Sequence, residues 1–245
     1  MRWFVLLVLA FGLCSCAYVP RRAVAPVPTL TFGPEEAEEL IVLLPGRFSR
    51  PEEFVKTGFL DQVRHFNPKA RVEIPDLHLT YYIGRSVDTR LEEDIIIPAR
   101  ERGVKKISLV GISMGGLGSL LHAVRKEDRV DEIVMLSPFA GKDKVIEEIT
   151  RAGGLAEWEA PDPLNKRDYS RLLWRELQDK WGDESGRPEL YLGCGTSDDL
   201  LSAARLLERE FVPAENVVYA DGGHDWPTWV SLYREIELKK SGRRR

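Results

Sequence analysis

The sequence predicts an α/β fold, with one doubly wound, mostly parallel sheet of about six strands, flanking helices and a helical lid insertion. Three observations favour it. Short apolar runs alternate with segments of helical periodicity, and the runs are apolar at consecutive positions, as in strands buried on both faces. Glycines and prolines are spread along the chain, which suits many turns between strands and helices. Finally, 245 residues with 43% hydrophobic side chains suffice for one sizeable core.

Six apolar runs are the expected strands. They are residues 39–46, 70–77, 105–111, 131–137, 188–195 and 215–223. Because helical segments separate most of them, the series implies parallel strands with right-handed crossovers.

The expected helices each carry one apolar stripe. They are residues 86–102, 115–126, 199–211 and a last helix from Trp226 to about Lys240. Pro98 predicts a kink or an early end in the first of them, because proline cannot donate a backbone hydrogen bond. Pro227 suits the start of the last helix, where its missing N–H is not needed.

Residues 141–188 contain helical pieces but no convincing strand, and we expect them to form a lid between two strands. Three of the six tryptophans lie there: Trp158, Trp174 and Trp181. Their side chains either line an apolar pocket or anchor the lid on the sheet, and the second interpretation is favoured.

The N-terminal segment has the features of an export signal. A positive start at Arg2 precedes an apolar run that is too short to span a bilayer, so residues 1–15 are expected to be a signal peptide. Leu13-Cys14-Ser15-Cys16 resembles the lipobox of bacterial lipoproteins, which implies lipidation of Cys16 and a place in the bacterial cell envelope. Cys14 fits less well, because Leu13 is bulky where a small residue is needed. In the Gram-negative lipoproteins that this segment resembles, a residue such as Ala17 after the cysteine implies export to the outer membrane, facing the periplasm.

Residues 16–38 are rich in proline and have no periodicity, so we expect a tether there. The folded domain is then residues 39–245, with order beginning near Glu39.

Gly111-Ile112-Ser113-Met114-Gly115 matches the pattern G-x-S-x-G. The pentapeptide alone is a weak signal, but an expected strand precedes it and an expected helix follows, which is the setting of a nucleophile elbow. Ser113 is therefore the candidate nucleophile.

A nucleophilic serine needs a base and a carboxylate that orients the base. His224 follows the last expected strand and returns to the edge of the sheet that carries Ser113, whereas the other histidines, His65, His78 and His122, are interpreted as surface or packing residues. Asp198 and Asp199 compete as the acid. Asp199 stands where a helix N-cap is wanted, so Asp198 is preferred.

The order Ser113, Asp198, His224 resembles that of the α/β-hydrolase superfamily. The features GISMGG, GTSD and GGHDWPTW resemble the esterase branch that contains S-formylglutathione hydrolases and feruloyl-esterase-like proteins. That resemblance implies an oxyanion hole made by the backbone N–H groups of Met114 and Arg47, with Phe48 as a less favoured donor. Many relatives have His-Gly where this chain has Pro45-Gly46, and the first two strands of the family sheet are missing.

These observations predict an enzyme, a lipid-anchored serine hydrolase that cleaves small-molecule carboxylic esters through an acyl-enzyme intermediate. A lipase, thioesterase or amidase with the same triad is the alternative within enzymes, and a non-catalytic envelope lipoprotein is the alternative outside them. No cofactor or metal is implied. The 35 basic and 39 acidic side chains give no concentrated basic face, so nucleic acid is not an expected partner. The oligomeric state has no signal in the sequence.

Overall fold

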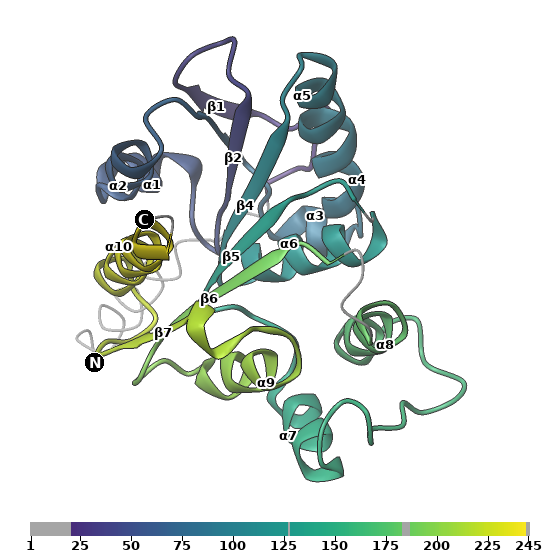
Figure 1. Ribbon diagram of the computed structural model, residues 1–245. Helices are drawn as coiled ribbons and strands as arrows, with labels where there is room; N and C mark the ends of the chain where they lie inside the picture. Colours follow the sequence, from purple (N-terminus) through teal and green to yellow (C-terminus); the bar gives the residue numbers. More distant parts are fainter. Residues whose placement is uncertain (1–20, 127, 183–186, 244–245) are drawn as a thin grey trace, which may run out of the picture.

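The computed structural model describes residues 21–126, 128–182 and 187–243, and it contains the doubly wound α/β sheet that the sequence predicts (Figure 1). Seven strands form the sheet in the order β1-β3-β2-β4-β5-β6-β7, and all neighbouring pairs except β1 and β3 are parallel. The strands are β1 (Thr29–Phe32), β2 (Glu39–Leu44), β3 (Arg71–Pro75), β4 (Lys106–Ile112), β5 (Glu132–Leu136), β6 (Glu189–Gly195) and β7 (Val217–Ala220).

Strand β1 corrects the expectation that residues 16–38 are a tether. It pairs antiparallel with β3 and occupies the edge of the sheet. The preceding residues are also packed: Arg21 bonds Asp76, and its backbone carbonyl accepts a hydrogen bond from the Thr80 hydroxyl at 2.8 Å. A strand of four residues between prolines is too short to show an alternating pattern in the sequence. Order begins before Glu39 because these residues pair with β3.

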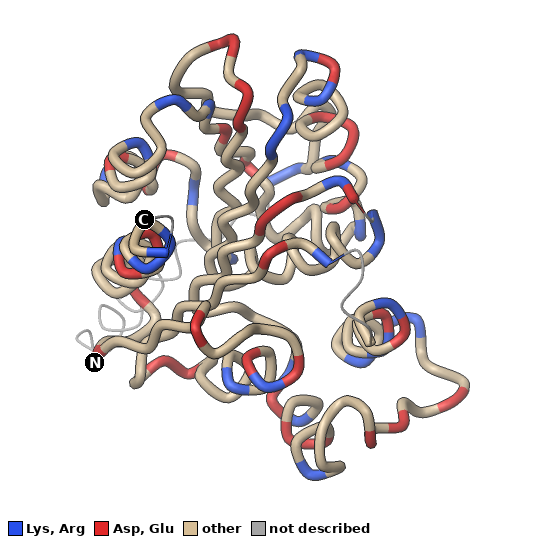
Figure 2. Tube along the Cα trace, viewed as in Figure 1, with Lys and Arg blue, Asp and Glu red and all other residues tan. Residues whose placement is uncertain are grey.

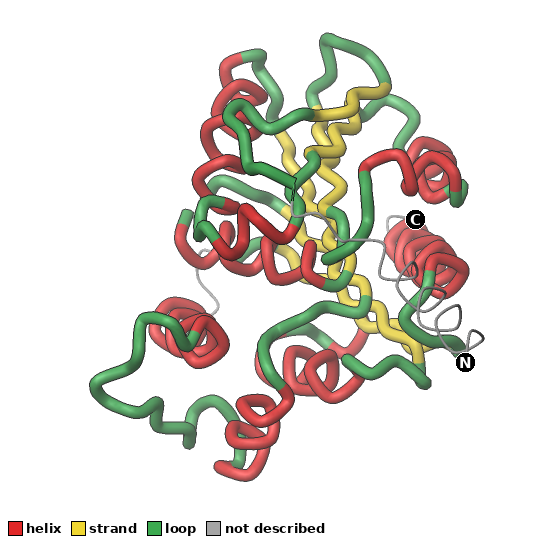
Figure 3. The backbone as a smooth tube through the Cα atoms, turned by 180° about the vertical axis from the view of Figure 1, so that it is seen from behind, coloured by secondary structure: helices red, strands yellow, loops and turns green. Residues whose placement is uncertain are grey.

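Helices cover both faces of the sheet (Figures 1 and 3). Three helices cover one face: α1 (Pro51–Lys56), α2 (Phe59–Phe66) and α10 (Trp226–Arg243). The other face carries α3 (Leu79–Ile83), α4 (Val87–Leu91), α5 (Ile97–Glu101), α6 (Met114–Arg125) and α9 (Leu201–Phe211), and the segment with α7 (Asp143–Ala152) and α8 (Tyr169–Trp181) lies further out on that side. The sequence analysis did not anticipate α1, α2 or α3.

Alternation along β2 separates the two cores. Leu40 and Val42 belong to the core under α6, while Ile41 and Leu43 belong to the core under α10. Both sets are buried, because a strand places successive side chains on opposite faces and both faces are covered. In Figure 2 the strands are accordingly almost free of charge, and charged residues gather in helices, loops and strand ends.

Pro98 does not end its helix. A π-helical turn, Glu92–Ile96, joins α4 to α5, and Pro98 sits at the start of α5. The expectation of an early end was therefore wrong: the irregularity is a wide turn before the proline, where the missing N–H is accommodated and the helical path continues.

The segment 141–188 carries α7 and α8 and no strand in its described part, between β5 and β6. Trp158, Trp174 and Trp181 are all buried. The Trp174 indole donates to the Ala140 carbonyl at 2.8 Å, and Trp181 packs edge-on against Phe211 of α9. The tryptophans thus anchor the segment, as the favoured interpretation predicted.

Candidate functional site

Ser113 lies in the sharp turn between β4 and α6. Its backbone angles, φ 53° and ψ −114°, fall outside the regions that residues with side chains prefer. Hydrogen bonds fix this conformation. The Ser113 N–H donates to the Leu136 carbonyl at 2.9 Å, and the Ser113 carbonyl accepts from the N–H groups of Gly116 and Phe139 at 2.9 and 3.0 Å. The turn is therefore held by β5 and the loop after it.

Two glycines of the pentapeptide are required by space. A Cβ on Gly115 would lie 2.1 Å from the Leu44 carbonyl oxygen, and a Cβ on Gly111 would lie 2.5 Å from the Gly115 backbone. Both distances are far inside van der Waals contact, so the motif lets α6 start directly against the ends of β2 and β4.

Asp198 and His224 are brought together by the loops after β6 and β7. The His224 Nδ1 lies 2.9 Å from Oδ2 and 3.0 Å from Oδ1 of Asp198. Burial alone would raise the pKa of Asp198, but the hydrogen bond to His224 and the one from the Leu200 N–H lower it below its usual value. The carboxylate stays ionised and is suited to orient an imidazole.

Asp199 is not the N-cap that the sequence analysis expected. Helix α9 begins at Leu201, its N-cap is Leu200, and no side chain caps it. Instead, Oδ1 of Asp198 accepts the Leu200 N–H at 2.8 Å. The carboxylate that meets the histidine therefore also holds the turn into α9, and the expected N-cap role of Asp199 was wrong.

Ser113 and the pair of Asp198 and His224 lie at the same edge of the sheet, because β4, β6 and β7 are parallel and each residue follows the end of its strand. In the described part of the chain, no hydrogen bond joins Ser113 to His224. Catalytic hydrogen bonds are often long without substrate and tighten when it binds, so the absence of this bond does not argue against a role for the pair.

The backbone N–H groups of Arg47 and Met114, beside Ser113, have no hydrogen-bond partner among the described residues. The loop after β2 passes close to the serine, since a Cβ on Gly46 would lie 3.5 Å from the Ser113 Cβ. Both Arg47 and Met114 line the cavity that Ser113 faces. Their N–H groups are therefore candidate donors for an oxyanion hole.

The cavity has a volume of about 490 Å³ and extends along α6 from Ser113 toward Arg125. Leu117 and Leu121 of α6 form its apolar floor, α3 and α4 form one wall, and α8 with the loop before it forms the other. Arg125 ties the walls together: its guanidinium binds Glu176 of α8 at 2.8 and 3.0 Å and Asp88 of α4 at 3.2 Å. The dimensions suit a small organic substrate.

Sequence reasoning missed two residues that position His224. The Trp229 ring meets the imidazole edge-on, with ring centroids 5.0 Å apart. Asp225 accepts the Thr228 N–H at 2.9 Å and so fixes the start of α10 directly after the histidine. An aspartate just before Trp-Pro is a cap signal that could have been read, whereas the contact of Trp229 depends on tertiary placement.

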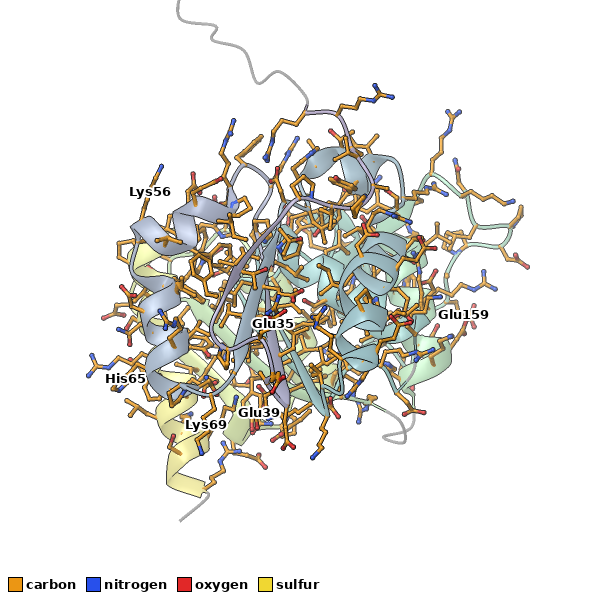
Figure 4. All side chains as sticks on the ribbon, turned by 90° about the horizontal axis from the view of Figure 1, so that it is seen from above. Glu35, Glu39, Lys56, His65, Lys69 and Glu159 are labelled. Carbon is orange, nitrogen blue, oxygen red and sulfur yellow. The ribbon has the colours of Figure 1, made fainter. Side chains whose placement is uncertain are left out.

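The remaining histidines have the packing or surface positions expected of them. His65 is exposed on α2, at the outer side of the molecule (Figure 4). His78 and His122 are buried. Cys194 is buried too, and burial raises the pKa of its thiol to about 12, which makes it an unreactive core residue.

Cys16 lies outside the described residues. Within the ranges that the structure covers, no helix is long and apolar enough to cross a membrane, and no three His, Cys, Asp or Glu side chains are grouped to hold a metal ion.

A family model described as "Putative esterase" matches residues 95–238, which is more than half of the chain. This stretch contains Ser113, Asp198 and His224. No curated protein matches the sequence.

Solved structures share the fold at low sequence identity. Est1E from Butyrivibrio proteoclasticus is 17% identical, with a TM-score of 0.61 over 88% of this chain and 93% of that one. An S-formylglutathione hydrolase from Staphylococcus aureus is 18% identical, with a TM-score of 0.55 over 91% and 99% of the two chains. A ferulic acid esterase is 17% identical, with a TM-score of 0.58 over 87% and 91%.

Proposed function

This chain belongs to the family of putative esterases and has the α/β-hydrolase fold, and on that premise we propose that it is a serine hydrolase that cleaves carboxylic esters through an acyl-enzyme intermediate. The observation that carries the proposal is the position of Ser113. It sits in a strained turn at one end of the cavity, beside two backbone N–H groups that have no partner in the described residues. Strain of this kind persists where function requires it.

In the first step, the Ser113 Oγ attacks the ester carbonyl carbon while its proton passes to Nε2 of His224. The Asp198 carboxylate holds Nδ1 of the imidazole, so that Nε2 is the basic nitrogen, and it stabilises the imidazolium that forms. The N–H groups of Met114 and Arg47 donate to the oxygen that becomes negative.

The tetrahedral intermediate then collapses. The bond to the leaving alcohol breaks, His224 gives its proton to the alcohol oxygen, and the acyl group remains on Ser113. Water repeats the sequence with His224 as the base, which releases the carboxylic acid and restores the serine.

A fluorophosphonate probe tests the proposal, because it labels only an activated serine. The wild-type chain should be labelled within minutes and should release nitrophenol from p-nitrophenyl esters, whereas the Ser113→Ala variant should do neither. Ser119→Ala, which changes a buried serine of α6, is the matched control and should stay labelled. Labelling that persists in Ser113→Ala would show that another serine reacts.

We also propose that the enzyme is lipid-anchored in the bacterial cell envelope through Cys16. The support is the lipobox-like Leu13-Cys14-Ser15-Cys16. Cys16→Ser should abolish incorporation of labelled fatty acid and recovery with membranes, while Cys14→Ser should leave both nearly intact. Label that persists on the Cys16→Ser protein would contradict this site.

A further inference from the structure

The charge of the cavity differs from that of the whole chain. The chain has a formal net charge of −4. The side chains that line the cavity, however, include four arginines and a single aspartate: Arg47, Arg85, Arg125, Arg167 and Asp88. The excess of positive charge is therefore local to the site that contains Ser113, and in a concave site such an excess attracts anions.

Within the residues that the structure describes, only one of these arginines pairs with carboxylates. Arg125 binds both Asp88 and Glu176, so it joins the cavity walls, and its positive charge is compensated by these two carboxylates. The guanidinium of Arg85 donates to the backbone carbonyl of Lys166, which carries no net charge. Among the described residues, no carboxylate lies within 4 Å of the guanidinium of Arg47, Arg85 or Arg167.

Arg47, Arg85 and Arg167 come from three separate segments: the loop after β2, the turn between α3 and α4, and the loop before α8. All three are exposed, and all three line the same cavity, whose floor is the apolar surface of Leu117 and Leu121. The backbone of Arg85 has φ 55°, a left-handed conformation that few residues with a side chain adopt.

We propose that the ester substrate is an anionic amphiphile: its apolar part lies along Leu117 and Leu121, and its carboxylate or phosphate is bound by Arg47, Arg85 and Arg167. Guanidinium groups match these anions through paired hydrogen bonds, and they bind most strongly beside apolar surface, where water is scarce. This inference rests on the proposed esterase function, and it names the substrate class of the same site.

Two matched substrate pairs test it. Mono-p-nitrophenyl glutarate and p-nitrophenyl 5-methylhexanoate have acyl groups of similar shape, of which only the first ends in a carboxylate. The butyrate esters of 4-(carboxymethyl)phenol and of its methyl ester place the charge on the leaving group instead. The ratio of kcat/KM for the anionic ester to that for the neutral ester is measured in each pair, because general damage to catalysis cancels in a ratio.

In the wild type the ratio should exceed ten in at least one pair, and that pair shows which side of the scissile bond carries the anion. Arg85→Gln and Arg167→Gln should each lower that ratio about tenfold, as expected for one charged hydrogen bond, and Arg167→Lys should recover part of it. Raising the salt concentration should lower the ratio as well. The matched control is Arg234→Gln on the exposed side of α10, which removes the same charge on the opposite face of the sheet and should leave the ratio unchanged.

Ratios near one in both pairs, or ratios that Arg85→Gln and Arg167→Gln leave unchanged, would overturn the inference. Failure of the proposed function looks different: no ester of either charge would be cleaved, and the fluorophosphonate probe would not label Ser113.

Discussion

Asp198 meets the imidazole of His224 with both carboxylate oxygens, at 2.9 and 3.0 Å from Nδ1. The neighbouring Asp199 has no such contact. Asp198→Asn should therefore lower kcat toward p-nitrophenyl esters by about 10⁴, because an amide can stabilise the wrong tautomer of the histidine. Asp199→Asn should change kcat less than threefold. If Asp199→Asn proved the more harmful substitution in folded protein, the assignment of the acid would be wrong.

The nucleophile and the base should contribute more than the acid. Ser113→Ala and His224→Ala are each expected to lower kcat by about four to six orders of magnitude, and the double variant should be little worse than either, since the residues act as one unit. Single-turnover hydrolysis of a p-nitrophenyl ester measures this. Additive losses in the double variant would argue that the two side chains work separately.

The oxyanion hole can be tested at Arg47 by separating side chain from backbone. Arg47→Ala keeps the N–H and should retain most of kcat toward neutral esters. Arg47→Pro removes the N–H, and loss of one such donor typically lowers kcat about 10²–10³-fold. Because proline also restricts Gly46 before it, circular dichroism must show that the variant is folded. A folded Arg47→Pro enzyme with normal kcat would move the donor to Phe48.

His122 should make the protein sensitive to acid. Burial lowers the pKa of this histidine from 6.5 to about 4, and its Nε2 lies 3.5 Å from Oε2 of Glu92, which also contacts Arg129. Below pH 6.5 His122 is protonated in the unfolded chain, whereas in the folded protein it becomes protonated only below about pH 4. The free energy of unfolding therefore falls as the pH drops through this window, by at most about 3 kcal/mol from this residue.

Urea denaturation at pH 7.0 and pH 4.5 measures that loss. His122→Gln should reduce the difference between the two free energies of unfolding by about 2 kcal/mol, whatever it does to stability at neutral pH. His65→Gln, the same change on the exposed face of α2, should leave the difference unaltered. An equal acid sensitivity in wild type and His122→Gln would contradict the prediction.

The parts of the fold that the sequence predicted are those with a local signal. The six parallel strands are continuous apolar runs, and the turn at Ser113 is specified by Gly111 and Gly115, for which no other residue fits. Strand β1 has only four residues and owes its existence to pairing with β3. The N-cap role expected of Asp199 was wrong, because Oδ1 of Asp198 accepts the Leu200 N–H, and two adjacent aspartates in a sequence do not show which carboxylate makes that contact.

The cavity could not be predicted from the sequence, because its lining residues are brought together only by tertiary packing. Arg85 and Arg167 are 82 positions apart, and neither stands in a motif. They line one cavity because the long segment with α8 folds back beside α6, held by Trp174 and by the pairing of Arg125 with Glu176.

With the lipid proposed on Cys16, the packing of Arg21 would limit how far the enzyme can lie from a bilayer. Arg21 is fixed to Asp76 and Thr80, and Thr80 belongs to α3, whose Leu79, Tyr82 and Ile83 line the cavity. Cys16 is only five positions earlier, so even a fully extended connection would span at most about 18 Å. Arg21 would then lie within that distance of the headgroups, and the cavity beside α3 would be held near the membrane. The rate at which the enzyme hydrolyses an amphiphilic ester would then depend on the surface density of that ester in the leaflet. It would not depend on the concentration of the ester in the surrounding solution.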